Sequence, residues 1–407
     1  MAAFIATLVF GLIHGAPAFA AWRAAQRLAV RPPPPIPPAS WPPVRVILPF
    51  AGATPDVRPA LDDLAAQDYP DFKIHLACHA EDGAACALAK SWSQERARRG
   101  GPPIQFVPAK TARSCGQKNR NLLAALETPD SADAVLVFTD VHYRRPPDWL
   151  RSLVAPLAAN RAAATSGYYF AETGKDWRAF LRPVTALLLF LTRQSGALRQ
   201  PWGGATAIPR RLFDELRVAD LWSTNVVDDV SLAGQLRRAR IPVEGINAPA
   251  LLAPAGDAAD FRWGNWFVRQ LAYLRAIQPG AWAGLGAGFL LSAASLLWMA
   301  GMIARAATDP ASAAIAAGDL LLLAALALRL RRLHPRPGPR GYWLAAFFGF
   351  ILAAPACHLR TAFSRTIRWR GVDYRVGRGG RVLATSAIPA KPKATPPAEA
   401  PPPPGAA

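Results

Sequence analysis

The sequence predicts an α/β domain with a mostly parallel sheet, placed between apolar helices that are long enough to cross a membrane. Residues 44–275 alternate short buried strands with helical segments, which is the rhythm of a doubly wound sheet. Outside this region, a bilayer span of roughly 20 residues is matched by four apolar runs, at residues 2–22, 276–304, 310–328 and 341–359. A wholly soluble chain would have to bury all of these runs in one core.

Residues 1–22 are expected to form an uncleaved N-terminal transmembrane anchor. Ala18-Phe19-Ala20 resembles a signal peptidase site, so a cleaved signal peptide is the alternative. No Lys or Arg precedes the apolar run, whereas Arg23 and Arg27 follow it. The positive-inside rule then places the following domain in the cytoplasm. Residues 23–43, rich in Arg and Pro, are expected to form an extended linker.

The central domain is expected to begin with strands at 44–49, 72–77, 104–107 and 134–138. Helices are expected between and after them at 57–67, 84–98 and 115–126. Ligands of such sheets bind at the carboxyl ends of the strands. Asp140 follows the fourth strand directly, and Glu81-Asp82 follows the second. These acids are therefore candidates for a site at the sheet edge.

The C-terminal half is expected to hold a membrane domain over residues 276–363, with two crossings plus a third crossing or a re-entrant segment. An Arg-rich loop at 329–340 indicates a cytoplasmic connection. A full last crossing would put the basic juxtamembrane segment 364–386 outside, against the same rule. The last run is therefore expected to be re-entrant or interfacial, with Pro355 at the bend. Asp319 is either functional or a shallow residue near one end of its run. Residues 387–407 are expected to form a disordered Pro/Ala tail.

The balance of charged residues indicates which kinds of partner the protein binds. Lys and Arg number 47 against 27 Asp and Glu, a formal net charge of +20. Such an excess suits nucleic acid, an anionic membrane or an acidic substrate. Because the Arg residues cluster beside apolar runs, we expect a membrane and an acidic substrate and no nucleic acid. The four Cys residues show no metal-binding spacing, which is typical of a reducing compartment.

Four segments resemble a membrane-bound family 2-type (GT-A) glycosyltransferase of the ceramide glucosyltransferase-like branch. They read FTDVHYRRPPDWL at 138–150, PWGGATAIPR at 201–210, NVVDDVSLAGQLRRARIPVEG at 225–245 and FVRQLAYLRAI at 267–277. The resemblance covers residues 44–275 and, more loosely, 366–375. It implies a GT-A domain that takes a sugar from a nucleotide-diphosphate donor.

The resemblance also implies roles for particular residues. Asp82 matches the nucleotide-binding acid, and Asp140 matches the strand-end acid that helps hold the metal and the diphosphate. The pair Asp228-Asp229 contains the proposed general base, with Asp229 the better match. Lys118, in a helix start similar to the family's G-x-K-x-x-N-L, is a candidate for phosphate binding.

The resemblance extends to the acceptor segment and to the final motif. Trp202-Gly203-Gly204 match the glycine-rich acceptor segment, and Arg269 opens the final (Q/R)xxRW motif. The chain departs from that motif because the expected Arg and Trp are Ala272 and Tyr273; Arg275 or Arg262-Trp263 are the alternatives. The strand-end motif is likewise not a strict DxD.

The chemistry explains these residue types. Mg²⁺ or Mn²⁺ would take oxygen ligands from Asp140, and His142 could add a nitrogen for Mn²⁺ or be a solvated loop residue. A carboxylate such as Asp229 can accept the proton of the attacking hydroxyl. Simple capping roles are the alternatives for Asp140 and Asp229. Gly203-Gly204 would permit close backbone approach or form an ordinary turn.

We therefore expect a multi-pass glycosyltransferase of the inner (plasma) membrane with a cytoplasmic catalytic domain. It would transfer one sugar, with inversion, from a UDP-sugar or another nucleotide donor to a lipid acceptor, ceramide or another membrane lipid. A polysaccharide synthase and a non-catalytic scaffold with the same fold are the alternatives.

Overall fold

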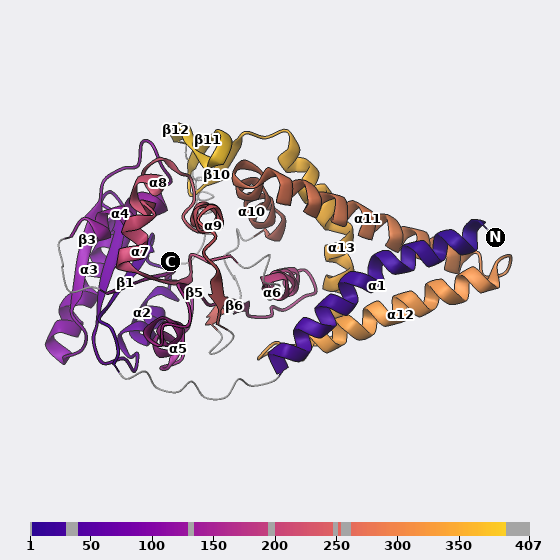
Figure 1. Cartoon of the computed structure of the whole chain (residues 1–407), viewed down its shortest axis with the longest axis horizontal. Coiled ribbons are helices and arrows are strands. Elements are labelled where there is room, and N and C mark those ends of the chain that lie inside the picture. The colour runs from indigo at the N-terminus through magenta and orange to yellow at the C-terminus, as the bar shows by residue number, and fades with distance from the viewer. Residues whose placement is uncertain are drawn as a thin grey trace, which may run out of the picture.

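The computed structural model describes residues 2–29, 40–128, 134–193, 200–246, 251–253 and 262–387. An α/β domain lies at one end, and long helices project from it toward the other end (Figure 1). Of the extended linker expected at 23–43, residues 23–29 are instead helical, because α1 continues to Ala29, and residues 30–39 lie outside the described residues. Almost all of the disordered tail expected at 387–407, from residue 388 on, also lies outside them.

A seven-stranded sheet with the order β3-β2-β1-β4-β7-β5-β8 forms the centre of the domain. β1 to β4 pair in parallel, as the alternation of strands and helices predicts. β7 differs, because it runs antiparallel between β4 and β5. In sheet order the strands are β3 Ile104–Ala109, β2 Phe72–His79, β1 Val44–Phe50, β4 Val135–Thr139, β7 Ala205–Pro209, β5 Ala164–Ser166 and β8 Val243–Gly245.

Helices cover both faces of this sheet because the central strands are apolar on both. In β1, Val46 and Leu48 belong to a cluster with Leu61 of α2, whereas Ile47 packs with Leu122 of α4. Neighbouring residues of a strand point to opposite faces, so one strand feeds two cores. The helices around the sheet are α2 Val57–Ala65, α3 Gly83–Arg99, α4 Gln117–Leu126, α5 Trp149–Ala158, α7 Arg210–Glu215, α8 Val218–Thr224 and α9 Asp229–Arg238.

Three long helices, α1 Ala2–Ala29, α11 Pro279–Ala304 and α12 Pro310–Arg331, run side by side away from the sheet (Figure 1). Each is long and apolar enough to cross a membrane. Their outer surfaces expose leucines, including Leu12, Leu321 and Leu322 at 72%, 70% and 71%. Asp319 does not face outward, because its Oδ2 lies 2.7 Å from Nδ1 of His14 on α1.

A fourth apolar helix, α13 Arg340–Ala362, is also long enough to cross and continues through Pro355. Just before it, Nε2 of His334 lies 2.7 Å from the Ala171 carbonyl oxygen. At its other end, Arg275 of α10 (Trp263–Ile277) donates to the Thr361 carbonyl oxygen at 2.8 Å. Both ends of α13 therefore contact the α/β side of the molecule, and α6 (Leu181–Arg193) also packs against it.

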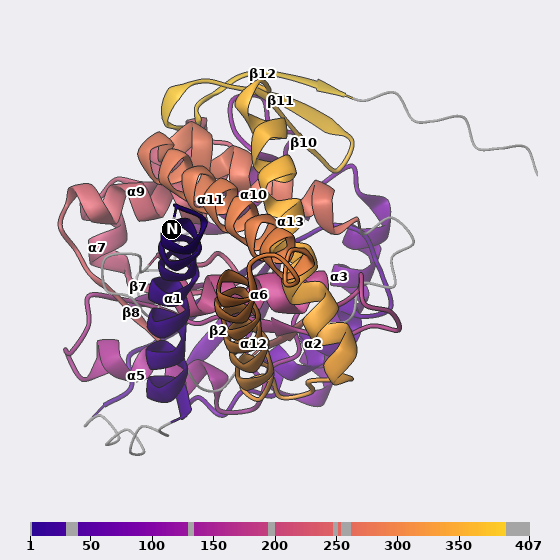
Figure 2. The same cartoon turned by 90° about the vertical axis from the view of Figure 1, so that its right-hand side faces the viewer.

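After α13 the chain forms a small sheet of β10 Thr366–Trp369, β11 Val372–Val376 and β12 Val382–Ala387, above α10 in Figure 2. A short turn at Arg378–Gly380 precedes β12. The Val226 amide donates to the Gly380 carbonyl oxygen at 3.0 Å, so this sheet docks just before the Asp228-Asp229 pair. A further two-stranded sheet joins β6 Tyr169–Ala171 with β9 Leu251–Ala253.

Candidate active site

Lys118, Asp140 and Asp228 form the centre of the site. Asp140 follows the carboxyl end of β4, Lys118 is the second residue of α4, and Asp228 immediately precedes α9. Lys118 Nζ lies 2.9 Å from Asp140 Oδ1 and 3.0 Å from Asp228 Oδ2. One ammonium group thus joins the carboxylates of Asp140 and Asp228, which are 88 positions apart in the sequence. The site lies at the sheet edge that the strand-end acids predict.

The electrostatics of this cluster follow from its burial. Burial lowers the pKa of Lys118, but the charges of Asp140, Asp228 and Asp229 outweigh it and hold that pKa above its usual range. Burial raises the pKa of Asp228 to about 6, against the opposing effect of Lys118. The cluster therefore holds a permanent positive charge beside a carboxyl group that can take up a proton near neutral pH.

Asp229 is held differently from its neighbour. It is the first residue of α9, and its Oδ2 accepts a hydrogen bond from the Gly203 amide at 3.2 Å. Asp228 occupies the N-cap position but makes no side-chain cap bond. The acid pair thus contacts Lys118 and the glycine-rich segment across the site, while Asp229 Oδ1 also accepts from the Val230 amide at 2.7 Å at the start of α9.

Gly203 and Gly204 lack side chains because there is no room for them. A Cβ at Gly203 would lie 2.3 Å from Asp228 Oδ2, and one at Gly204 would lie 2.2 Å from the Trp202 ring. Both glycines allow close approach, and neither has a positive φ. The Trp202 ring contacts Tyr143 and Tyr169, each with ring centroids 4.9 Å apart. The predicted acceptor segment is therefore packed between the acids and an aromatic cluster.

Arg145 holds the backbone around Asp140, a role that could not be identified from the sequence. Its guanidinium is buried and donates to Thr139 Oγ1 at 2.7 Å, to the Tyr143 carbonyl oxygen at 2.8 Å and to the Asp140 carbonyl oxygen. Burial lowers its pKa to about 10. The Arg-Arg-Pro-Pro run after the strand carries no signal that distinguishes this residue from Arg144.

Asp82 links two loops at the same edge. Its Oδ1 accepts from the Ala85 amide at 3.1 Å, which caps α3, and its Oδ2 accepts from the Gly52 amide at 2.7 Å. His142 Nδ1 instead lies 2.7 Å from Asp56 Oδ2. Within the described ranges, no group of three or more His, Cys, Asp or Glu residues could hold a metal ion by itself.

The final motif lies on α10. Arg275, one alternative to the missing motif Arg, donates to the carbonyl oxygens of Thr361 and Ser364 and so fastens α13. In the other alternative, Arg262-Trp263, Trp263 donates to Thr185 Oγ1 at 2.9 Å. Tyr273 is buried, which raises its pKa to about 12, and it lies within range of the charges of Asp228 and Asp229. Arg269 makes no hydrogen bond or ion pair with any residue that the structure describes.

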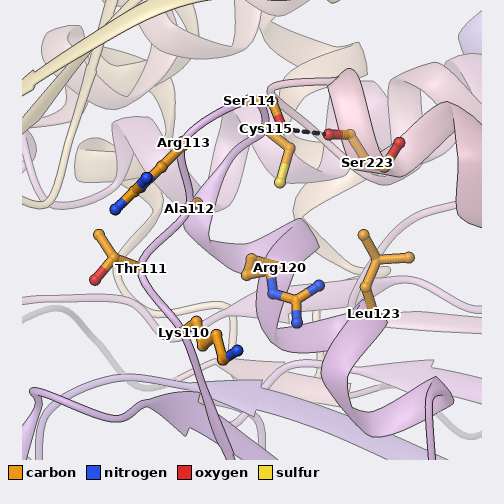
Figure 3. Close-up of a pocket in the computed structure, with 9 residues that line it drawn as sticks. All are labelled: Lys110, Thr111, Ala112, Arg113, Ser114, Cys115, Arg120, Leu123 and Ser223. Carbon is orange, nitrogen blue, oxygen red and sulfur yellow. Dashed lines mark hydrogen bonds between the residues drawn. The ribbon is translucent and has the colours of Figure 1, made fainter.

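A pocket lies beside the site, where the loop before α4 meets α8 (Figure 3). Ser114 Oγ donates to the Ser223 carbonyl oxygen at 3.0 Å across it. None of the site residues predicted from the sequence lines this pocket. Its lining consists of Lys110, Thr111, Ala112, Arg113, Ser114, Cys115, Arg120, Leu123 and Ser223.

The sequence matches the model of glycosyltransferase family 21 over residues 5–382. The protein belongs to this family. No curated protein matches the sequence. The structure resembles a mannosyltransferase from Pyrobaculum calidifontis in complex with GDP-Man and Mn²⁺, with a TM-score of 0.52, 22% identity and coverage of 86% of this chain and 98% of that chain. The family and this shared fold identify the protein as a glycosyltransferase with a GT-A fold.

Two further structures are more distant from this family 21 glycosyltransferase. S. aureus TarS 1-349 in complex with UDP-GlcNAc has a TM-score of 0.38 and 12% identity, with 85% of this chain and 99% of that chain covered. GalNAc-T7 with UDP, GalNAc and Mn²⁺ has a TM-score of 0.38 and 13% identity, with 59% and 51% covered.

Proposed function

We propose that this family 21 glycosyltransferase transfers a sugar, with inversion, from a nucleotide-diphosphate donor to a lipid at the cytoplasmic face of the membrane. The observation that carries the proposal is the Lys118–Asp140–Asp228 cluster with Asp229 beside it. The cluster sits at the carboxyl edge of the sheet, where α10 leads directly into the membrane helices.

The donor side of the site suits a diphosphate with a divalent cation. Asp140 and Asp228 already face a positive charge, the Lys118 ammonium. Mg²⁺ in such sites is often held by one or two carboxylates together with substrate phosphates, so a larger set of protein ligands is not required. Asp140 would hold Mg²⁺ or Mn²⁺, which would neutralise charge on the leaving diphosphate. A ligand role for His142 stays a prediction, since its Nδ1 contacts Asp56.

Asp229 is the proposed base. It would accept the proton of the acceptor hydroxyl while the hydroxyl oxygen bonds to the anomeric carbon and the nucleoside diphosphate leaves. One displacement of this kind inverts the configuration at that carbon. The Gly203 amide, which donates to Asp229 Oδ2, would keep the carboxylate directed at the acceptor segment.

A lipid acceptor is supported by the way α10 joins the site to the apolar helices. Phe267 and Leu271 of α10 are buried in a cluster with Ala354 and Cys357 of α13. Tyr273 of the same helix packs against Val226, close to the acid pair. An acceptor whose tail lies among the apolar helices would therefore have its headgroup near Asp229. Ceramide is one candidate among membrane lipids.

The test is transfer from labelled UDP-glucose, UDP-N-acetylglucosamine and GDP-mannose to total lipid extract, with Mg²⁺ or Mn²⁺ present. Wild type is compared with Asp229→Asn and with Asp220→Asn, a matched change at an exposed acid on α8 that pairs with Arg217. We expect a labelled lipid whose formation falls by roughly 10²–10⁴-fold in Asp229→Asn alone. Equal transfer by Asp229→Asn and wild type would contradict the assignment of the base. A labelled polymer in place of a lipid would favour the polysaccharide synthase instead.

A further inference from the structure

The hairpin between β10 and β11 carries an arginine at its tip. Trp369 pairs with Val372, which leaves a two-residue loop of Arg370 and Gly371. The φ angles of these two residues are +47° and +75°. Type I′ hairpin turns require positive φ at both loop positions and favour Asn or Asp followed by Gly. A long charged side chain is therefore an unusual occupant of the first position.

This tip lies in the proposed donor site, although it comes from the end of the described chain. Arg370 Nη1 donates to the Ala51 carbonyl oxygen at 2.9 Å, across 319 positions of sequence. The next residue, Gly52, donates its amide to Asp82 Oδ2 at 2.7 Å. The hairpin therefore touches the loop after β1 at the point where that loop meets Asp82.

The charges around Arg370 are those of the same site. Its side chain reaches solvent, yet enough protein surrounds it for desolvation to lower its pKa. Asp82 and Asp140 oppose that shift, and the like charge of Arg269 adds to it. The guanidinium thus lies within electrostatic range of the two donor-side acids and of the motif arginine on α10.

Arg269 and Arg370 are like charges within electrostatic range of each other. Neither makes an ion pair with any residue in the described ranges. Two like charges held near each other are unfavourable unless an anion joins them. Guanidinium groups bind phosphate oxygens through parallel hydrogen bonds, so a diphosphate is the anion that fits two of them.

We propose that Arg370 binds the diphosphate of the nucleotide donor together with Arg269, so that the hairpin after the last apolar helix completes the active site. This inference rests on the proposed transferase function. The rest of the C-terminal sheet holds the hairpin in place: the Gln117 amide, at the start of α4, donates to the Tyr374 hydroxyl at 3.3 Å. The Asn225 amide group donates to the Gly379 carbonyl oxygen at 2.8 Å.

A purely structural role is the competing explanation, in which Arg370 only pins the hairpin to Ala51. Replacement of Arg370 by glycine distinguishes the two roles. Arg370→Gly removes the guanidinium but suits the positive φ of the turn, so the hairpin backbone is relaxed rather than damaged. A diphosphate-binding role predicts weaker nucleotide binding in a fold that is equally or more stable.

The experiment measures binding of UDP, GDP, ADP and CDP, and of the matching monophosphates, to the full-length protein in detergent with Mn²⁺. Wild type, Arg370→Gly, Arg370→Lys and two controls are compared. The controls are Arg368→Ala, which removes a pair with Asp373 on the neighbouring surface, and Arg375→Ala, which removes an exposed charge from β11. Melting temperatures and the donor KM are measured on the same samples.

We expect Arg370→Gly to lose about ten- to a hundredfold in affinity for the preferred diphosphate, the effect of one charge-assisted contact. Monophosphate binding and the melting temperature should not fall, Arg370→Lys should recover part of the loss, and both controls should match wild type. An unchanged ratio of diphosphate to monophosphate affinity would overturn the inference. So would a parallel loss of both affinities with a lower melting temperature, which would indicate pinning alone. A wild type that binds none of the nucleotides would instead refute the proposed function.

Discussion

Replacement of Lys118 by methionine tests the centre of the site most directly. The change keeps the length of the side chain and removes the charge between Asp140 and Asp228. With an effective dielectric constant of about 20, each contact near 3 Å represents roughly 5 kcal/mol of gross attraction. Desolvation offsets much of this, so we expect a net loss of about 3–5 kcal/mol in the free energy of unfolding. At about 2–4 °C per kcal/mol, the melting temperature should fall by roughly 10 °C.

The loss should depend on pH, with a sign set by Asp228. Its pKa in the folded protein is about 6, above the ordinary value of 3.8. Because the folded state binds this proton more tightly, the stabilisation from Asp228 is present below pH 3.8 and lost as the pH rises through 6. Without Lys118 the pKa of Asp228 rises further. The destabilisation in Lys118→Met should therefore be largest at pH 8 and shrink toward pH 5.

The assay is thermal unfolding followed by tryptophan fluorescence between pH 5 and pH 8. Adding Asp228→Asn to Lys118→Met removes the uncompensated buried charge, so the double variant should be more stable at pH 8 than the single one. Arg120→Met is the matched control on the same helix; its pair with Glu127 is partly exposed and worth about 0–1 kcal/mol. If Lys118→Met melted like wild type at pH 8, and the second change brought no recovery, the assigned coupling would be wrong.

Three further predictions follow from the same contacts. Gly203→Ala forces a methyl group against Asp228 Oδ2, so transfer should fall at least about tenfold, measured as kcat with the fold checked by circular dichroism. Protonation of Asp228 should make kcat/KM fall as the pH drops below about 6. If the same fall persisted in Asp228→Asn, the titrating group would be another residue. His14→Ala should leave Asp319 unpaired among apolar helices and lower the free energy of unfolding by about 2–3 kcal/mol. Adding Asp319→Asn to His14→Ala should raise the melting temperature again, and the absence of any recovery would argue against the pairing.

Much of the fold could be predicted from local pattern. The first four strands and the helices between them are confirmed, because buried strands and amphipathic helices leave periodic signals. The placement of Asp82 and Asp140 after strand ends is confirmed for the same reason. The antiparallel course of β7 left no such signal, since strand direction depends on the path of the chain before it.

Several residues of the candidate site could be proposed from the sequence, but the contacts between them could not. Lys118 is expected at a helix start, but its position between two carboxylates depends on the packing of α4 against the loop before α9. Arg145 and Arg370 act through contacts that local periodicity does not encode. In a chain with 47 Lys and Arg residues, charge alone does not single out either one.

The C-terminal sheet also constrains the membrane topology. The β10–β11 hairpin contacts Ala51, and the segment before α13 contacts Ala171, so both ends of α13 lie on the side of the α/β domain. α11 and α12 leave that side and return to it, whereas α1 begins at the far end of the bundle (Figure 1). We therefore infer three crossings, with α13 lying along the membrane surface. Protease added outside sealed cells should cleave a tag placed before α1 but not a tag placed after β12. Cleavage of the tag after β12 would require α13 to cross the membrane, which would put the hairpin on the opposite side from the active site.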